Sequence, residues 1–295
     1  MRLDIYLTQK TKRPRSHIQQ AIHDGLVSVN GKVVTKPSFL ITDETVEYKI
    51  PEPKDLTVLS PEEIPIEILY EDASLLVVNK PAGMVTHPAV TTTEHTLVNA
   101  LLYRYPDLPV GDDPMKPGIV HRLDKGTSGC LVVAKTLECL QNLQKQFKAR
   151  EVQKIYRALV VGSMHDEGRI EKAIGRHLKV RHKISSHTLK GKEAITEWKV
   201  LEHFGTRLSW VEVYLHTGRT HQIRVHFAEA GHPVVGDLIY GRRQAGGLKE
   251  EVSRPCLHAF QLGFAHPKTG EKMFFEAPLP EDLTQLLKSL RRGQC

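Results

Sequence analysis

The sequence predicts an α+β protein built from two parts of unequal size. Its 295 residues are more than one average domain needs. Helical and strand patterns are mixed along the chain without the regular alternation of a parallel βαβ protein. Four prolines between residues 51 and 65 separate a short basic segment from a longer, strand-rich remainder. We therefore predict a domain of residues 1–50, a linker of residues 51–65 and a second domain of residues 66–295.

Composition and charge point to a cytoplasmic protein with a polyanionic partner. Hydrophobic residues make up 40% and charged residues 25% of the chain, which is typical of a globular protein. The net charge of +7 favours nucleic acid as the partner. The four cysteines form no CxxC pair, which fits a reducing compartment. Since no apolar run approaches the roughly 20 residues of a membrane helix, we expect no membrane partner.

The first 50 residues predict two helices followed by a hairpin. LDIYL reads as a short helix, and RSHIQQAIHDG as a second helix with an apolar face and a glycine stop. LVSVNGKVV reads as two strands around Asn30-Gly31, a strong hairpin signal. The basic cluster before the second helix suits phosphate binding, with a solvated charged face as the alternative. It consists of Lys10, Lys12, Arg13 and Arg15.

The longer part predicts a β-rich domain with a few helices. An apolar run within residues 64–83 predicts strands, and helical patterns occupy residues 96–105 and 137–150. Strand patterns dominate afterwards, over residues 155–162, 195–202, 208–218 and 273–279.

The segment HRLDKGTSG, residues 121–129, carries the first candidate site. It lies between the apolar runs GIV and CLVVA, which read as buried strands. In an extended segment Arg122 and Asp124 share one face, while Leu123 turns to the core. A carboxylate beside a turn on a rigid scaffold is a typical functional arrangement. A purely structural Arg–Asp pair is the alternative.

A second polar constellation lies in LHTGRTHQIRVHFAEAGHPVVGD, residues 215–237. Gln222, Arg224 and His226 alternate, which predicts that they share one face of a strand. The histidines of this stretch raise a metal site as an alternative. Their spacing matches no zinc motif, so polar residues lining a groove are favoured.

Two further stretches carry residues suited to RNA. Lys154, Tyr156 and Ala158 alternate, so the tyrosine shares a face with a small neighbour and can pack in the core or stack on a base. The stretch of residues 175–192 contains six basic residues and no acid, as in a phosphate-contacting loop. Walker, GxGxxG and GxSxG motifs are absent from the sequence, so we expect no cofactor.

Taken together, these stretches resemble the RluA-type family of pseudouridine synthases over nearly the whole chain. HRLDKGTSGCLVVAKT is similar to the family's catalytic motif, and NKPAGMVTHP, REVQKIYRALVVG, TGRTHQIRVH and LHAFQLGF occur in the family's order. RLDIYL, RSHIQQAIHDGLVSVNGKVV and TDETVEY resemble the small S-four type of RNA-binding domain. The resemblance implies a mixed, mainly antiparallel sheet flanked by helices and loops, preceded by a small α/β domain.

The resemblance also implies an activity, the isomerisation of uridine in RNA to pseudouridine. It implies Asp124 as the catalytic carboxylate, Arg224 as its partner, Tyr156 against the target base, and Arg122 in the place that the uridine leaves. The substrate it implies is large-subunit (23S) ribosomal RNA or a precursor particle, acted on by a monomer without metal. A non-catalytic assembly factor and the same chemistry on tRNA are the alternatives. The remaining expected RNA contacts are Lys12, Arg13, Arg15, Arg176, Arg181, Lys183, Arg219 and Gln222.

Overall fold

The computed structural model divides the chain into two compact units, Met1–Val58 and Leu59–Cys295. It describes residues 1–11, 13, 15–50, 59–89, 92–178, 180, 183–241 and 252–293. Two predicted RNA contacts, Lys12 and Arg181, lie outside the described residues, as do residues 51–58 of the predicted linker. None of the helices within the described ranges is both long and apolar enough to cross a membrane.

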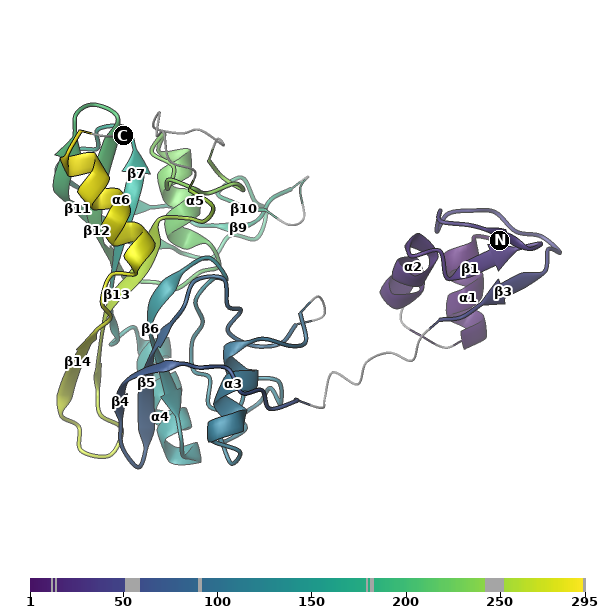
Figure 1. Cartoon of the computed structure of the whole chain (residues 1–295), viewed down its shortest axis with the longest axis horizontal. Helices are drawn as coiled ribbons and strands as arrows, with labels where there is room; N and C mark the ends of the chain where they lie inside the picture. Colours follow the sequence, from purple (N-terminus) through teal and green to yellow (C-terminus); the bar gives the residue numbers. More distant parts are fainter. Residues whose placement is uncertain are drawn as a thin grey trace. The chain divides into compact units, whose positions relative to one another are not determined.

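The N-terminal unit consists of two helices and a three-stranded antiparallel sheet (Figure 1). Leu3 and Leu7 of the first helix and Ile18 and Ile22 of the second are fully buried in one small core. Asn30 and Gly31 both have positive φ, as the hairpin prediction requires, and this prediction is confirmed. The elements are α1 (Leu3–Thr11), α2 (Arg15–His23), β1 (Val27–Val29), β2 (Lys32–Val33) and β3 (Val46–Tyr48).

A nine-stranded mixed sheet forms the second unit, as the resemblance implied. Its order is β4-β5-β6-β13-β7-β12-β11-β8, with β14 added to β13, and only β6 and β13 pair in parallel. The strands are β4 (Glu67–Glu71), β5 (Leu75–Lys80), β6 (Ser128–Ala134), β7 (Gln153–Val161), β8 (Glu167–Glu171), β11 (Ile195–Phe204), β12 (Leu208–Leu215), β13 (Leu257–Ala265) and β14 (Lys272–Glu276). The helices are α3 (Leu97–Arg104), α4 (Leu137–Ala149), α5 (Gln222–Glu229) and α6 (Glu281–Arg291). A separate two-stranded ribbon pairs β9 (Gly175–Arg176) with β10 (Ile184–Ser185).

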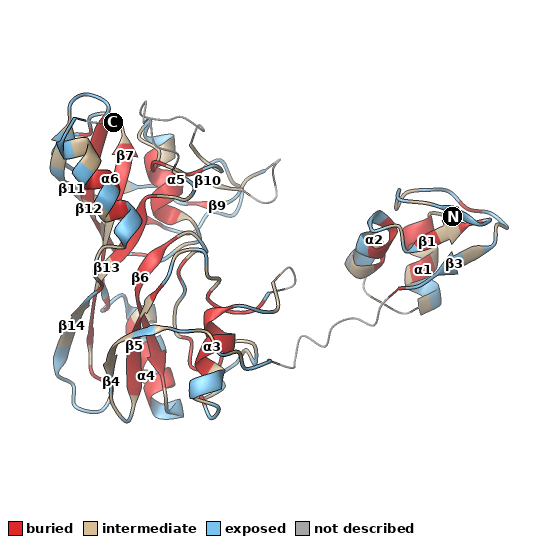
Figure 2. Cartoon of the chain, in the orientation of Figure 1, coloured by how far each residue is buried: buried red, intermediate tan, exposed pale blue. Residues whose placement is uncertain are grey.

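Helices cover both faces of the sheet around β5 and β6, which explains why these strands are apolar without alternation. Cys130 and Val132 of β6 pack in a core with Leu140 of α4. Leu131 and Val133, on the opposite face, pack in a core with α3. Both strands are almost entirely buried (Figure 2). A two-sided sheet of this kind gives continuous apolar runs.

The parallel pairing of β6 with β13 requires a glycine at position 129. Gly129 has φ +117 and lies opposite Ala259. A Cβ at this position would collide with the backbone oxygen of Ala259. This close approach attaches the chain just after the HRLD segment to the centre of the sheet. It therefore fixes the point at which the turn after this segment ends.

The predicted strand over Gln222, Arg224 and His226 is wrong, because these residues belong to helix α5. Alternation reveals a strand when one face is buried and the other is wet. In α5 both sets are buried: the apolar residues pack in the core, and the three polar residues are at most 6% exposed. The alternation therefore does not separate a buried face from an exposed one. Gln222 and His226 both contact Thr196 Oγ1, whereas Arg224 contacts Asp237 and Asp124.

The HRLD segment is a loop rather than the end of a strand. Of the GIV run, only Ile119 makes an isolated bridge, to Val133. The prediction that Leu123 turns to the core is confirmed, since this side chain is 4% exposed and packs under β5 and β6. Asp124 follows it half-buried, and Arg122 precedes it exposed.

Candidate active site

Six of the predicted site residues line one cavity of about 350 Å³ in the second unit. The HRLD loop, β7, and the turn that leads from β12 into α5 form its walls. The structure thereby brings together segments about 100 residues apart in sequence. The six residues are Arg122, Asp124, Tyr156, Arg219, Gln222 and Arg224.

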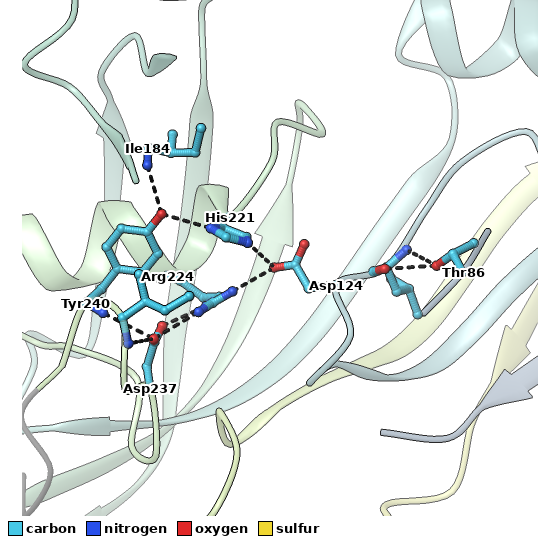
Figure 3. A network of polar contacts seen from close by, with 9 residues as sticks. Thr86, Asp124, Ile184, His221, Arg224, Asp237 and Tyr240 are labelled. Carbon is cyan, nitrogen blue, oxygen red and sulfur yellow. Dashed lines mark hydrogen bonds and ion pairs between the residues drawn. The ribbon is translucent and has the colours of Figure 1, made fainter. Parts of the chain in front are cut away.

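Arg224 joins two carboxylates, only one of which is exposed to the cavity. Its Nε and Nη2 donate to the two oxygens of Asp237, at 2.7 and 2.9 Å. The remaining nitrogen, Nη1, donates to Oδ2 of Asp124 at 3.2 Å (Figure 3). The Asp237 side chain is fully buried, whereas that of Asp124 keeps 19% of its surface exposed. Asp237 therefore fixes the guanidinium, and the guanidinium orients Asp124.

His221 is the second neighbour of Asp124, and its ring bridges to a tyrosine. Tyr240 accepts a hydrogen bond at its hydroxyl from the Ile184 backbone N–H, at 3.0 Å. The same hydroxyl lies 2.8 Å from His221 Nδ1. His221 Nε2 lies 3.8 Å from Asp124 Oδ2, and this acceptor favours the neutral tautomer with its proton on Nε2 (Figure 3). The chain of contacts connects strand β10 to the carboxylate.

The electrostatics of this network keep Arg224 charged and His221 neutral. Burial lowers the pKa of the Arg224 guanidinium, but the hydrogen bonds and charge of Asp237 outweigh this and raise it. Burial likewise opposes ionisation of Asp237, yet its bonds to Arg224 lower its pKa overall. Burial lowers the pKa of His221 below its ordinary value, and the charge of Asp124 offsets this only in part.

A neighbouring loop holds the HRLD segment in place. Thr86 Oγ1 donates to the Leu123 carbonyl at 2.9 Å and accepts from the Leu123 N–H at 3.3 Å (Figure 3). Lys80 is fully buried at the start of the same loop, where Nζ donates to the carbonyls of Pro81 and Met84, both at 2.8 Å. Burial lowers the pKa of Lys80 to about 7.

Tyr156 lies on β7 with its side chain at the cavity wall. Burial, followed by the nearby charge of Asp124, raises the pKa of its phenol. The hydroxyl therefore stays protonated at neutral pH, and the ring offers a flat apolar surface beside the carboxylate.

Gln222 has a structural role that the sequence did not reveal. Its Nε2 donates to the Ile195 carbonyl and to Thr196 Oγ1, and its Oε1 accepts from Thr217 Oγ1 at 2.7 Å. The same oxygen accepts from the Arg219 N–H at 3.1 Å. Since the whole amide is used within the protein, these bonds favour a positioning role over the predicted RNA contact.

Four other predicted RNA contacts belong to the β9–β10 region and to the N-terminal unit. Arg176 is an exposed residue of β9, and Lys183 directly precedes β10. In the N-terminal unit, Arg15 donates two hydrogen bonds to Asp4, and Arg13 donates to the Ile50 carbonyl. These contacts give both arginines a part in holding their unit together.

The histidines of residues 215–237 have separate partners. His216 pairs with Glu197, His226 contacts Thr196 and the Lys172 carbonyl, and His232 contacts the Val161 carbonyl. Within the ranges that the structure describes, no three histidine, cysteine or acidic side chains are placed to hold one metal ion.

Asp237, His221 and Tyr240 were not predicted as site residues. Asp237 is 13 residues beyond Arg224, past the end of α5, and Tyr240 reaches the site from the following turn. The sequence pointed to these residues only through their position in or near the polar stretch of residues 215–237. Nothing in their spacing identifies them as partners of Arg224 and His221.

Comparison with known proteins identifies the family. A family model described as RNA pseudouridylate synthase matches residues 74–229, and a model of the S4 domain matches residues 1–46. The chain is 46% identical to an uncharacterized RNA pseudouridine synthase of Aquifex aeolicus, covering 90% of this chain and 86% of that protein. It is 40% identical to the ribosomal large subunit pseudouridine synthase D of Vibrio vulnificus, covering 94% and 87%.

The solved structures agree with these relatives. Human RNA pseudouridylate synthase domain containing 1 aligns with a TM-score of 0.59 and 30% identity, over 82% of this chain and 98% of that one. The fold is thus that of an RNA pseudouridylate synthase, an RNA-modifying isomerase. The chain belongs to the RNA pseudouridylate synthase family and carries an S4 domain at its N-terminus.

Proposed function

We propose that this pseudouridine synthase acts on uridines of large-subunit ribosomal RNA, as a cytoplasmic monomer, with Asp124 as its catalytic carboxylate. The RNA is inferred from relatives named ribosomal large subunit pseudouridine synthase D. The residue is inferred from one arrangement: Arg224, fixed by buried Asp237, directs its remaining nitrogen at Asp124 on the wall of the cavity.

In the proposed reaction a uridine leaves the RNA stack and enters the cavity. Extruding a base costs a few kcal/mol. The planar guanidinium of Arg122 offsets part of that cost by stacking where the base was. The base packs on Tyr156, and Asp124 attacks the nucleoside. The N1–C1′ bond breaks, the base turns, C5 joins C1′, and the bond to Asp124 breaks so that the carboxylate is regenerated. The C5 proton is lost and N1 gains a proton, so no cofactor is consumed.

Arg224 supplies a fixed positive charge next to the proposed catalytic carboxylate, with its Nη1 3.2 Å from Asp124 Oδ2. The guanidinium stays charged throughout the reaction, since its pKa is raised by its two carboxylate neighbours. Its attachment to Asp237 means that no side chain has to move to provide this charge.

The test compares Asp124→Asn with the wild-type protein on three RNAs: large-subunit rRNA, small-subunit rRNA and tRNA. We expect the variant to bind RNA normally and to form no pseudouridine, while the wild type modifies large-subunit rRNA. Asp107→Asn, at an exposed aspartate outside the cavity, is the control. Normal turnover by Asp124→Asn would refute the catalytic assignment, and modification of tRNA alone would refute the ribosomal substrate.

A further inference from the structure

The cavity contains a second group of polar side chains that the proposed roles leave unused. Lys154 lies two residues before Tyr156 on β7, and both side chains line the cavity. Within the described part of the chain, no acceptor pairs with the Lys154 ammonium. Burial, with the charges of Arg150 and Arg219, lowers the pKa of this lysine to about 8. An unpaired, half-buried cation in a substrate cavity is costly unless a ligand completes it.

His121 adds a neutral hydrogen-bond donor to the same cavity. Its ring lines the cavity and stacks on Phe147, with ring centres 4.6 Å apart. Nε2 accepts from the Val132 backbone N–H at 3.1 Å. Burial lowers the pKa of His121 to about 3, and the charge of Lys154 contributes. The ring is therefore neutral with its proton on Nδ1, for which the described residues provide no acceptor.

We propose that Lys154 and His121 form a subsite that binds the O4 carbonyl oxygen of the uracil base. This inference rests on the proposed function, because it places the target uridine in this cavity. Tyr156 is two residues from Lys154 on β7, and the charge of Asp124 acts on its phenol. We therefore place the target base on the Tyr156 ring, with its ribose toward Asp124 and the opposite edge of the base toward Lys154. Two donors suit a uracil carbonyl and cannot pair with the amino group of cytosine, which is itself a donor.

The subsite also has a role in the chemistry, whichever atom Asp124 attacks. If the carboxylate displaces the base from C1′, the electron pair of the broken N1–C1′ bond spreads from N1 onto the two carbonyl oxygens. If it adds to C6, the pair of the C5–C6 double bond moves onto O4. In both routes the negative charge reaches an oxygen that Lys154 would contact. A preorganised cation at such a position stabilises the transition state more than the ground state.

The first experiment measures single-turnover pseudouridine formation by Lys154→Met and Lys154→Arg. We expect the methionine variant to lose about 10²–10³-fold in rate, the usual effect of removing one such donor. We expect arginine to recover much of the loss. Lys145→Met removes a charge from the exposed face of α4, outside the cavity, and is the control for net charge. A Lys154→Met rate within about twofold of wild type would overturn the inference.

The second experiment separates a base contact from a phosphate contact. In the Asp124→Asn background, RNA with the target uridine is compared with RNA carrying an abasic ribose there, which keeps every phosphate. We expect Lys154→Met to weaken binding of the uridine RNA and to leave the abasic RNA unaffected. Equal weakening of both would assign Lys154 to the backbone and overturn the proposal. The variant His121→Met keeps only a weak sulfur acceptor near the Val132 N–H and has no donor, so we expect it to weaken binding of the uridine RNA selectively.

The dependence of activity on pH is a third measurement. Replacing Lys154 by arginine would not change it if Lys154 had only a structural role. The cation is needed in its protonated form, so wild-type activity should fall as pH rises above about 8. Lys154→Arg stays charged and should extend activity to higher pH; an unchanged profile would contradict the proposal. If the wild-type protein forms no pseudouridine in any RNA, the proposed function fails and this inference with it. If the wild type forms pseudouridine and the Lys154→Met rate is within about twofold of it, this inference alone is refuted.

Discussion

Arg224 and Asp237 form a two-pronged ion pair in which both oxygens of the buried carboxylate each accept from a different guanidinium nitrogen. The geometry leaves Nη1 directed at Asp124. Asp237 is held in turn by the backbone N–H groups of Ile239 and Tyr240, which donate to its Oδ1 at 2.9 and 3.2 Å. The orientation of Asp124 therefore depends on a series of contacts: the backbone beyond α5 holds Asp237, Asp237 holds Arg224, and Arg224 contacts Asp124.

Arg224→Lys should inactivate the enzyme although it keeps the charge. A lysine ammonium is a single point and cannot donate in parallel to Asp237 while also reaching Asp124. We expect the rate of pseudouridine formation to fall by about 10²-fold or more, as when a preorganised electrostatic group is lost. RNA affinity should change little. The measurement is single-turnover pseudouridine formation together with RNA binding.

Arg291→Lys is the matched control for that substitution. Arg291 also donates from two nitrogens to one carboxylate, that of Glu202, but on an exposed surface away from the cavity. Exposed pairs of this kind contribute little to stability, so this variant should retain wild-type turnover. Equal activity of Arg224→Lys and Arg291→Lys would show that the fork on Asp237 does not position the catalytic carboxylate.

Sequence patterns located most strands of the sheet, but not β8 or β13, and the family resemblance of the quoted motifs pointed to the cavity residues. The apolar run of β6 identified a buried strand, and the HRLD segment beside it supplied Asp124 on a loop. The alternation of β7 placed Tyr156 on one strand face with Ala158, and the family resemblance implied its place against the target base. In these cases the deciding contacts are made by residues that are neighbours in the chain or share a strand face.

The contacts that arrange the site could not be predicted, because they join distant or differently folded segments. Period-two alternation misassigned α5, where neither set of residues faces solvent. The hydrogen bond from Ile184 to Tyr240 spans 56 residues, and that from Arg224 to Asp124 spans 100. Gln222 seemed suited to RNA by its type, yet its amide is used entirely by backbone and threonine partners that only the fold brings near.

Tyr240→Phe should slow the reaction without removing any group that faces the substrate. The ring would still lie over the Arg224 guanidinium, 5.2 Å away, but Ile184 N–H and His221 Nδ1 would lose their partner. We expect about a tenfold loss in rate, the value of one hydrogen bond of roughly 1.4 kcal/mol. Amide exchange at Ile184 should become faster, which can be followed by hydrogen-exchange mass spectrometry.

Tyr214→Phe provides the comparison for Tyr240→Phe. Tyr214 donates its hydroxyl proton to Glu212 at 2.8 Å, on strand β12 outside the cavity. It should keep wild-type turnover and wild-type exchange at Ile184. If Tyr240→Phe behaved in the same way, the chain from β10 to His221 would have no part in orienting Asp124.

Lys80→Met should change how stability depends on pH, because Lys80 is buried with its pKa lowered from 10.5 to about 7. Between these two values the unfolded chain binds a proton at Lys80 and the folded chain does not. Stability contributed by Lys80 therefore rises with pH over this window, by up to about 1.4 kcal/mol per pH unit. The variant lacks this rise, so the stability difference between wild type and Lys80→Met should grow in favour of wild type from pH 7 to pH 9.

Urea unfolding followed by fluorescence of Trp198 and Trp210, both in the second unit, measures this difference in stability. Lys145→Met is the control, and a wild-type–variant difference that stays constant from pH 7 to pH 9 would show that Lys80 is not the group whose proton is lost on folding.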